Sequence, residues 1–141
     1  MDPAKKLPRT ATIVAPGQGR VYPMGRMRAI FKADGDETET KYSISEWWLE
    51  PNTTGPGAHE HPEDHVYYVI DGELSVCFDG AWSQAERGSY ILIPGGTSHD
   101  FQNRSSARVG FMSINVPGGF ESHLPSIVEW FAEHPPGDAN P

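Results

Sequence analysis

The sequence predicts an all-β domain that ends in one short helix, and three observations support this. Fifteen glycines and thirteen prolines are spread along the 141 residues, so they divide the chain into many short elements. Short apolar stretches recur between these turn residues, at the close spacing that is typical of a β-sandwich or β-barrel. Only one segment, near the C-terminus, repeats its apolar residues at the helical period.

The expected strands lie within a β domain over residues 21–119, after an N-terminal arm over residues 1–20 that has little apolar pattern and is either mobile or laid across a partner. Asp79-Gly80 is the strongest hairpin signal, because both residues tolerate positive φ, and it joins 73–78 to 81–86. The recurring apolar stretches are 28–32, 42–50, 66–70, 74–78, 90–93 and 109–116.

The segment SHLPSIVEWFAEHP predicts the helix, within a C-terminal unit over residues 120–135. Ser122 or His123 could cap it, and Pro125 suits its first turn. Its apolar side chains share one face: Leu124, Ile127, Val128 and Phe131. We expect this face to close one end of the β core and residues 136–141 to form a frayed tail.

Composition and charge limit the classes of partner. Nineteen acidic and eleven basic residues give a net charge of −8, which argues against nucleic acid and anionic membrane surfaces. No segment approaches the roughly 18 apolar residues of a membrane span, and the N-terminal residues do not have the pattern of a targeting peptide. The single cysteine, Cys77, excludes an internal disulfide. A cytoplasmic protein is therefore expected.

Half of the six histidines fall within seven residues, at His59, His61 and His65. On a strand the first two point to the same side, and a short loop after Pro62 can bring the third ring back to them. Burying these imidazoles in a core would leave polar ring nitrogens without hydrogen-bond partners, which costs free energy. The close spacing of the three histidines therefore favours a shared ligand that binds imidazole. Downstream, His99 follows the tight turn Pro94-Gly95-Gly96.

These two stretches resemble the two motifs of the cupin superfamily, which consists of small jelly-roll β-barrels. The first motif is G-x5-H-x-H-x3,4-E-x6-G, which His59, His61 and Gly72 fit. The second motif is G-x5-P-x-G-x2-H-x3-N, matched at every position by Gly88, Pro94, Gly96, His99 and Asn103. The motifs cover residues 59–103, and the strand pattern extends the resemblance over about 25–116.

The sequence departs from the motifs at two places. Thr53 stands where the first motif begins with glycine, with Gly55 and Gly57 nearby, and His65 replaces the glutamate. Carried over residue by residue, the resemblance implies one divalent transition metal held by four histidines, His59, His61, His65 and His99. Fe or Mn is favoured, and Zn, Ni and Cu also suit imidazole. Four neutral ligands leave the full positive charge on the ion, which favours an anionic oxygen ligand.

Period-2 counting places further side chains on the inner face. Tyr67 and Val69 share the face of His65, and Phe101 and Asn103 share that of His99, so they are candidates to line a substrate pocket. Tyr67 could also act as an acid or hydrogen-bond donor. For the expected strand ISEWWLE, the sequence does not decide which set of alternate residues points inward. Either Glu46 and Trp48 point inward, with Glu46 as the base and Trp48 in the pocket, or Ser45 and Trp47 do.

Three classes of function fit these expectations. The first is a metal-dependent dioxygenase-type oxidoreductase that acts on an enolate-like or phenolic small molecule. The second is a Lewis-acid isomerase, cyclase or lyase with Zn or Mn, and the third is a non-enzymatic ligand-binding or sensing protein. By analogy with other cupins, exposed aromatic faces predict a homodimer.

Overall fold

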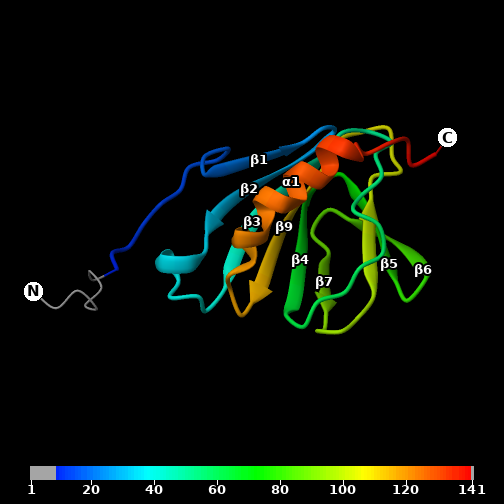
Figure 1. Cartoon of the computed structure of the whole chain (residues 1–141). Coiled ribbons are helices and arrows are strands. Elements are labelled where there is room, and N and C mark those ends of the chain that lie inside the picture. The colour runs from blue at the N-terminus through cyan, green and yellow to red at the C-terminus, as the bar shows by residue number, and fades with distance from the viewer. Residues whose placement is uncertain (1–8, 141) are drawn as a thin grey trace, which may run out of the picture.

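The all-β prediction is confirmed by the computed structural model, which describes residues 9–140. Within these residues nine strands form two sheets, and a short helix follows them (Figure 1). The elements are β1 (Arg20–Met24), β2 (Met27–Ala33), β3 (Ser43–Leu49), β4 (Asp64–Asp71), β5 (Glu73–Phe78), β6 (Ala81–Glu86), β7 (Tyr90–Ile93), β8 (His99–Gln102), β9 (Val109–Val116), the 3-10 turns η1 (Gly35–Glu37) and η2 (Phe120–His123), and α1 (Leu124–Glu133).

The larger sheet has the order β1-β2-β3-β9-β4-β7, and the smaller one has the order β6-β5-β8. All pairs are antiparallel. Asp79 and Gly80 both have positive φ, and Phe78 pairs with Ala81 as a two-residue hairpin requires. Strand β1 was not expected, because Pro23 interrupts its apolar pattern; the ladder tolerates this proline because β1 is an edge strand.

The core lies between the sheets and beneath α1. Strand β3 shows the alternation clearly, since its residues are buried and partly exposed in turn from Ser43 to Leu49. Two apolar residues of α1, Leu124 and Phe131, are fully part of the core, and Ile127 and Val128 pack against it. Figure 1 shows α1 crossing the strands of the larger sheet. The expected role of the helix face, to cover the β core, is thus observed.

The two ends of the chain differ from the expectations. Residues 1–8 of the expected arm lie outside the described part of the chain. The rest of the arm contacts the β domain: the Lys32 ammonium donates to Ala15 O at 3.2 Å, and Arg9 pairs with Glu39 at 2.8 Å. The expected frayed tail is instead bound through residues 137–140. Gly137 and Thr54 exchange hydrogen bonds, and Asn140 N donates to Asn52 at 2.7 Å.

No helix in residues 9–140 is long and apolar enough to cross a membrane.

Candidate metal centre

The histidines are brought together where an isolated backbone bridge to β8 of the smaller sheet faces β4 of the larger sheet. His59 and His61 lie in the segment before β4, and His59 forms an isolated bridge with His99 at the start of β8. Two backbone hydrogen bonds of 3.0 and 2.9 Å join that pair. His65 is the second residue of β4, and its side chain points inward. Residues from both motifs therefore meet at one place in the interior.

Three of the four imidazoles form a compact donor group. One nitrogen each of His59, His61 and His99 lies within 4.8 Å of the others. His65 is adjacent, because its ring centroid lies 3.8 Å from that of His61 and 5.7 Å from that of His99. The structure thus shows a three-histidine cluster beside a fourth ring, and His65 as the fourth ligand remains a prediction.

Backbone carbonyls fix the orientation of two rings. His59 Nδ1 lies 2.8 Å from Gly57 O, and His99 Nδ1 lies 2.8 Å from Thr97 O. A carbonyl only accepts, so each Nδ1 carries the hydrogen and each Nε2 keeps a free lone pair. This is how metal-binding histidines are commonly oriented by their surroundings.

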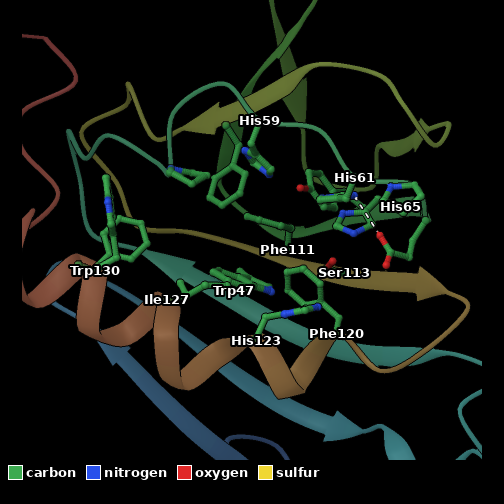
Figure 2. A pocket seen from close by; sticks show the side chains of 16 residues that line it. Trp47, His59, His61, His65, Phe111, Ser113, Phe120, His123, Ile127 and Trp130 are labelled. Atoms are coloured by element: carbon green, nitrogen blue, oxygen red, sulfur yellow. Dashed lines mark ion pairs between the residues drawn. The ribbon is translucent and has the colours of Figure 1, made fainter.

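Five buried ring nitrogens have no hydrogen-bond partner among residues 9–140: both nitrogens of His61, both of His65, and Nε2 of His99. Figure 2 marks the contact between His61 Nδ1 and Glu63, but its 3.7 Å exceeds a hydrogen bond. Unpaired buried polar atoms are costly and need an explanation. Because neutral imidazole binds Zn, Fe, Cu, Ni and Mn, a divalent transition ion fits this donor set.

The same burial keeps the rings uncharged. Burial lowers the pKa of His65 to about 2, with repulsion from the neighbouring histidines adding to it. Burial also lowers the pKa of His99 to about 4, and it lowers that of His61. These side chains are therefore neutral at neutral pH, which is the form that binds a metal ion.

A cavity of about 430 Å³ opens beside the histidines. Figure 2 shows it between the strands and α1. Its walls are mainly apolar and aromatic, and they are formed by Trp47, Pro56, His59, His61, Pro62, Glu63, His65, Tyr67, Phe101, Phe111, Ser113, Phe120, His123, Ile127, Trp130 and Phe131. The structure thus places two of the expected pocket residues, Tyr67 and Phe101, in the wall.

The prediction that Glu46 and Trp48 point into the pocket is wrong. Both lie on the opposite face of β3, where Trp48 Nε1 donates to Glu46 at 3.2 Å and Glu46 lies 3.5 Å from Lys32 Nζ. Trp48 covers Gly110 of β9, where any Cβ would meet its ring, and Arg108 stacks on it at 4.3 Å. Trp47 points inward instead, and Glu46 cannot serve as a base at the histidines.

Two other expected pocket residues have structural positions. Val69 is fully buried in the core and does not contact the cavity. Asn103 lies beyond the end of β8 and bridges loops, because its Nδ2 donates to Glu50 O at 3.0 Å and to Ala107 O at 2.7 Å. Its Oδ1 accepts from Ser105 N at 3.0 Å. The counting failed here because β8 ends at Gln102.

The sequence reasoning missed the wall that η2 and α1 supply. Phe120, His123 and Trp130 all line the cavity, although the sequence pointed to His123 only as a candidate helix cap. Phe120 also lies beside the cluster, with its ring centroid 5.5 Å from that of His65. The helical period predicted the inward face of α1, but nothing local predicted that η2 would point its side chains at the histidines.

A buried carboxylate fixes this wall. Asp34, between β2 and η1, accepts hydrogen bonds from Gly119 N at 2.6 Å and from Glu121 N at 2.8 Å. The Glu121 carboxylate in turn accepts from Arg20 and Tyr22, each at 2.6 Å. We call Asp34, Glu121, Arg20 and Tyr22 the η2 anchor. It attaches η2 to β1 and β2, so it determines where Phe120 and His123 lie.

Comparisons with known proteins agree with this architecture. A family model described as "Cupin domain" matches residues 45–115. An uncharacterized protein of Streptomyces coelicolor is 30% identical over 67 residues, which are 48% of this chain and 63% of that protein. The chain thus covers less than two thirds of that relative.

Two solved structures share the fold at low sequence identity. A predicted oxalate decarboxylase from Thermotoga maritima is 16% identical, with a TM-score of 0.69 over 75% of this chain and 99% of that one. The Bacillus subtilis oxalate decarboxylase, which has Mn(II) centres, is 17% identical, with a TM-score of 0.66 over 82% of this chain and 33% of that one. The matched model spans β3 to β9 and includes all four clustered histidines, and the chain belongs to the cupin family.

Proposed function

We propose that the protein is a metal-dependent small-molecule enzyme of the dioxygenase type, acting on an enolate-like or phenolic substrate. The observation that carries this proposal is the set of buried, unpartnered imidazole nitrogens facing an apolar cavity. His59, His61 and His99 would hold the ion with His65 as fourth ligand, and Fe or Mn is favoured. When bound, such an ion supplies Lewis acidity towards an anionic oxygen and, for a redox metal, a route for electrons to O₂.

The chain's own residues bind and orient the substrate. Aromatic walls, including Trp47 and Phe111, enclose it and exclude water. Tyr67 lines the cavity, and burial raises the pKa of its phenol above the ordinary value. The phenol therefore keeps its proton at neutral pH and can donate a hydrogen bond to a substrate oxygen.

A non-redox alternative is supported by the donor set. All four histidines are neutral donors, whereas non-haem iron oxygenases commonly include a carboxylate ligand. A Zn or Mn Lewis acid in this site would promote isomerisation, cyclisation or lyase chemistry. The neighbour with Mn(II) centres supports Mn as one candidate ion.

One experiment separates these functions. Protein purified without oxygen is analysed for metal and then assayed for O₂ uptake with catechols, flavonols and β-diketones. We expect one bound transition metal per chain and O₂ consumption with at least one of these compounds. Tightly bound zinc without O₂ uptake would favour the non-redox chemistry. Metal-free protein that still binds such compounds would favour a binding or sensing role.

The outer face of the larger sheet supports the proposal of a homodimer. Tyr68, Tyr90, Leu92 and Val116 are 42%, 64%, 51% and 49% exposed. The first three are neighbours on the outer side of β4 and β7. An apolar patch of this kind often marks an interface. Sedimentation analysis should show a dimer that Leu92→Glu dissociates, whereas a wild-type monomer would refute the proposal. A cytoplasmic location remains a prediction.

A further inference from the structure

We infer that the ligand of this site has its oxygen donors at one end only and an apolar, aryl-bearing body at the other, and that small dicarboxylates bind more weakly than such a ligand. This inference rests on the proposed function, because it takes the histidine cluster as the place where the oxygen donors bind. It goes further by assigning a role to each end of the cavity.

Except for His59 and His123, which lie between the two ends, the polar groups of the cavity are at one end. Figure 2 shows His61, His65 and the side chain that the dashed line joins to His61 on one side, while Trp130 and Ile127 lie on the other. The joined side chain is Glu63, a lining residue that carries negative charge. Oxygen donors of a ligand can therefore be bound at the histidine end by the ion that the imidazoles would hold.

The other end offers nothing to an anion. Its wall consists of Trp47, Ile127, Trp130 and Phe131, and none of the cavity-lining residues in the described chain is lysine or arginine. A carboxylate placed there would lose part of its hydration without gaining an ion pair, which is unfavourable. A ligand with charge at both ends is therefore disfavoured.

The centre of the cavity favours an aromatic ring. Phe101 packs edge-to-face against Trp47 and against Phe111, with ring centroids 6.0 and 5.0 Å apart. Another aryl group can extend this cluster in the same geometry. The cavity of about 430 Å³ also has room for such a body, which a two-carbon dianion would leave unfilled. Apolar contact then contributes affinity in proportion to the area buried.

Three probes test the inference on Zn²⁺-loaded protein by titration calorimetry: 1-phenylbutane-1,3-dione, pentane-2,4-dione and oxalate. The two diketones share one enolate head and differ by a phenyl in place of a methyl group. We expect the phenyl compound to bind about tenfold more tightly than pentane-2,4-dione, after correction for their affinities for free Zn²⁺. Oxalate should bind more weakly than the phenyl compound. Equal affinity of the diketones, or tightest binding of oxalate, would overturn the inference.

Variants at the apolar end provide the control. Ile127→Trp should remove the advantage of the phenyl compound by filling the space, and should weaken pentane-2,4-dione binding much less. If that variant does not fold, Trp130→Ala should reduce the same advantage by opening the wall. If a folded variant still binds the phenyl compound more tightly than pentane-2,4-dione by the same factor as the wild type, the assigned orientation is wrong.

Repeating the titrations without metal separates this inference from the proposed function. A phenyl preference that persists in protein unable to bind Zn²⁺ would support the ligand class and refute the metal role. Normal Zn²⁺ binding without a phenyl preference would refute the ligand class and leave the metal site standing.

Discussion

The histidine cluster and the η2 anchor both bury polar side chains, but they differ in how those groups are satisfied. In the anchor, both oxygens of the Asp34 carboxylate accept backbone N–H bonds, and Glu121 accepts from two side chains. In the cluster, five buried ring nitrogens have no partner in residues 9–140. A fully satisfied group serves the fold, whereas an unsatisfied one indicates a ligand.

This difference predicts opposite effects of mutation. Removing an anchor group leaves backbone donors unpaired and costs stability, since an unsatisfied buried donor is expensive. Removing a cluster imidazole from metal-free protein loses at most one hydrogen bond, which His59 and His99 make through Nδ1 to a backbone carbonyl. It should therefore weaken ligand binding more than it weakens folding.

The largest expected effect is that of His99→Ala on metal binding. His99 supplies one of the donor atoms and is the contribution of β8 to the cluster. We expect the affinity for Zn²⁺ to fall about 100-fold or more, because even indirect supporting contacts are worth 10–100-fold. Competition with a chelator measures this loss. His134→Ala, which alters a histidine outside the cavity, is the matched control. Unchanged affinity in His99→Ala would show that the donor assignment is wrong.

Next in size is the loss of stability in Asp34→Ala. The substitution leaves three backbone N–H groups, of Gly35, Gly119 and Glu121, without their acceptor. We expect a decrease of about 2–4 kcal/mol in the free energy of unfolding, measured in urea. Zn²⁺ affinity of the folded variant should change little, because Asp34 has no contact with the donor nitrogens. A stable variant with impaired Zn²⁺ binding would mean that Asp34 serves ligand binding and not the fold.

The third prediction concerns how the stability of the metal-free protein depends on pH. An unfolded histidine binds a proton near pH 6.5, whereas folded His99 does so near 4 and His65 near 2. Between these values the unfolded state binds more protons, so the free energy of unfolding decreases as the pH falls below 6.5. Each histidine contributes up to about 1.4 kcal/mol per pH unit. Above pH 6.5 these two groups contribute no pH dependence.

Urea unfolding of the metal-free protein at pH 7, 6 and 5 measures this effect. His99→Ala should show a shallower dependence because it removes one of the buried histidines whose pKa is lowered. Stability that stays constant from pH 7 to 5 would contradict the burial of neutral imidazoles.

The sequence was sufficient to predict the fold and the convergence of the histidines. Spacing within two short motifs determines which side chains share a strand face, and the turn residues limit how the motifs meet. Period counting therefore groups His59 with His61, and the resemblance to the two cupin motifs adds His99 to them.

Other parts of the site depended on contacts between distant residues. Because two adjacent residues of β3 are tryptophans, alternation along the strand does not show which of them points inward. The packing of Trp48 on Gly110 of β9 decides this. His123 lines the cavity because Asp34 binds the backbone of η2, a contact across 85 residues to Gly119. Local patterns cannot show which of two equally apolar faces turns inward, or where a turn is attached.

The smallest expected effect separates the members of the η2 anchor. Arg20 donates to Glu121 and Glu37, but its side chain is 46% exposed. Exposed ion pairs contribute little because water and salt screen them, so Arg20→Met should cost less than about 1 kcal/mol. Burial opposes ionisation of Glu121, yet hydrogen bonds from Arg20 and Tyr22 lower the pKa of its carboxyl. Tyr22 still donates to Glu121 in the variant. A cost in urea unfolding equal to that of Asp34→Ala would mean that the exposed pair, and not the buried carboxylate, holds η2 beside the histidines.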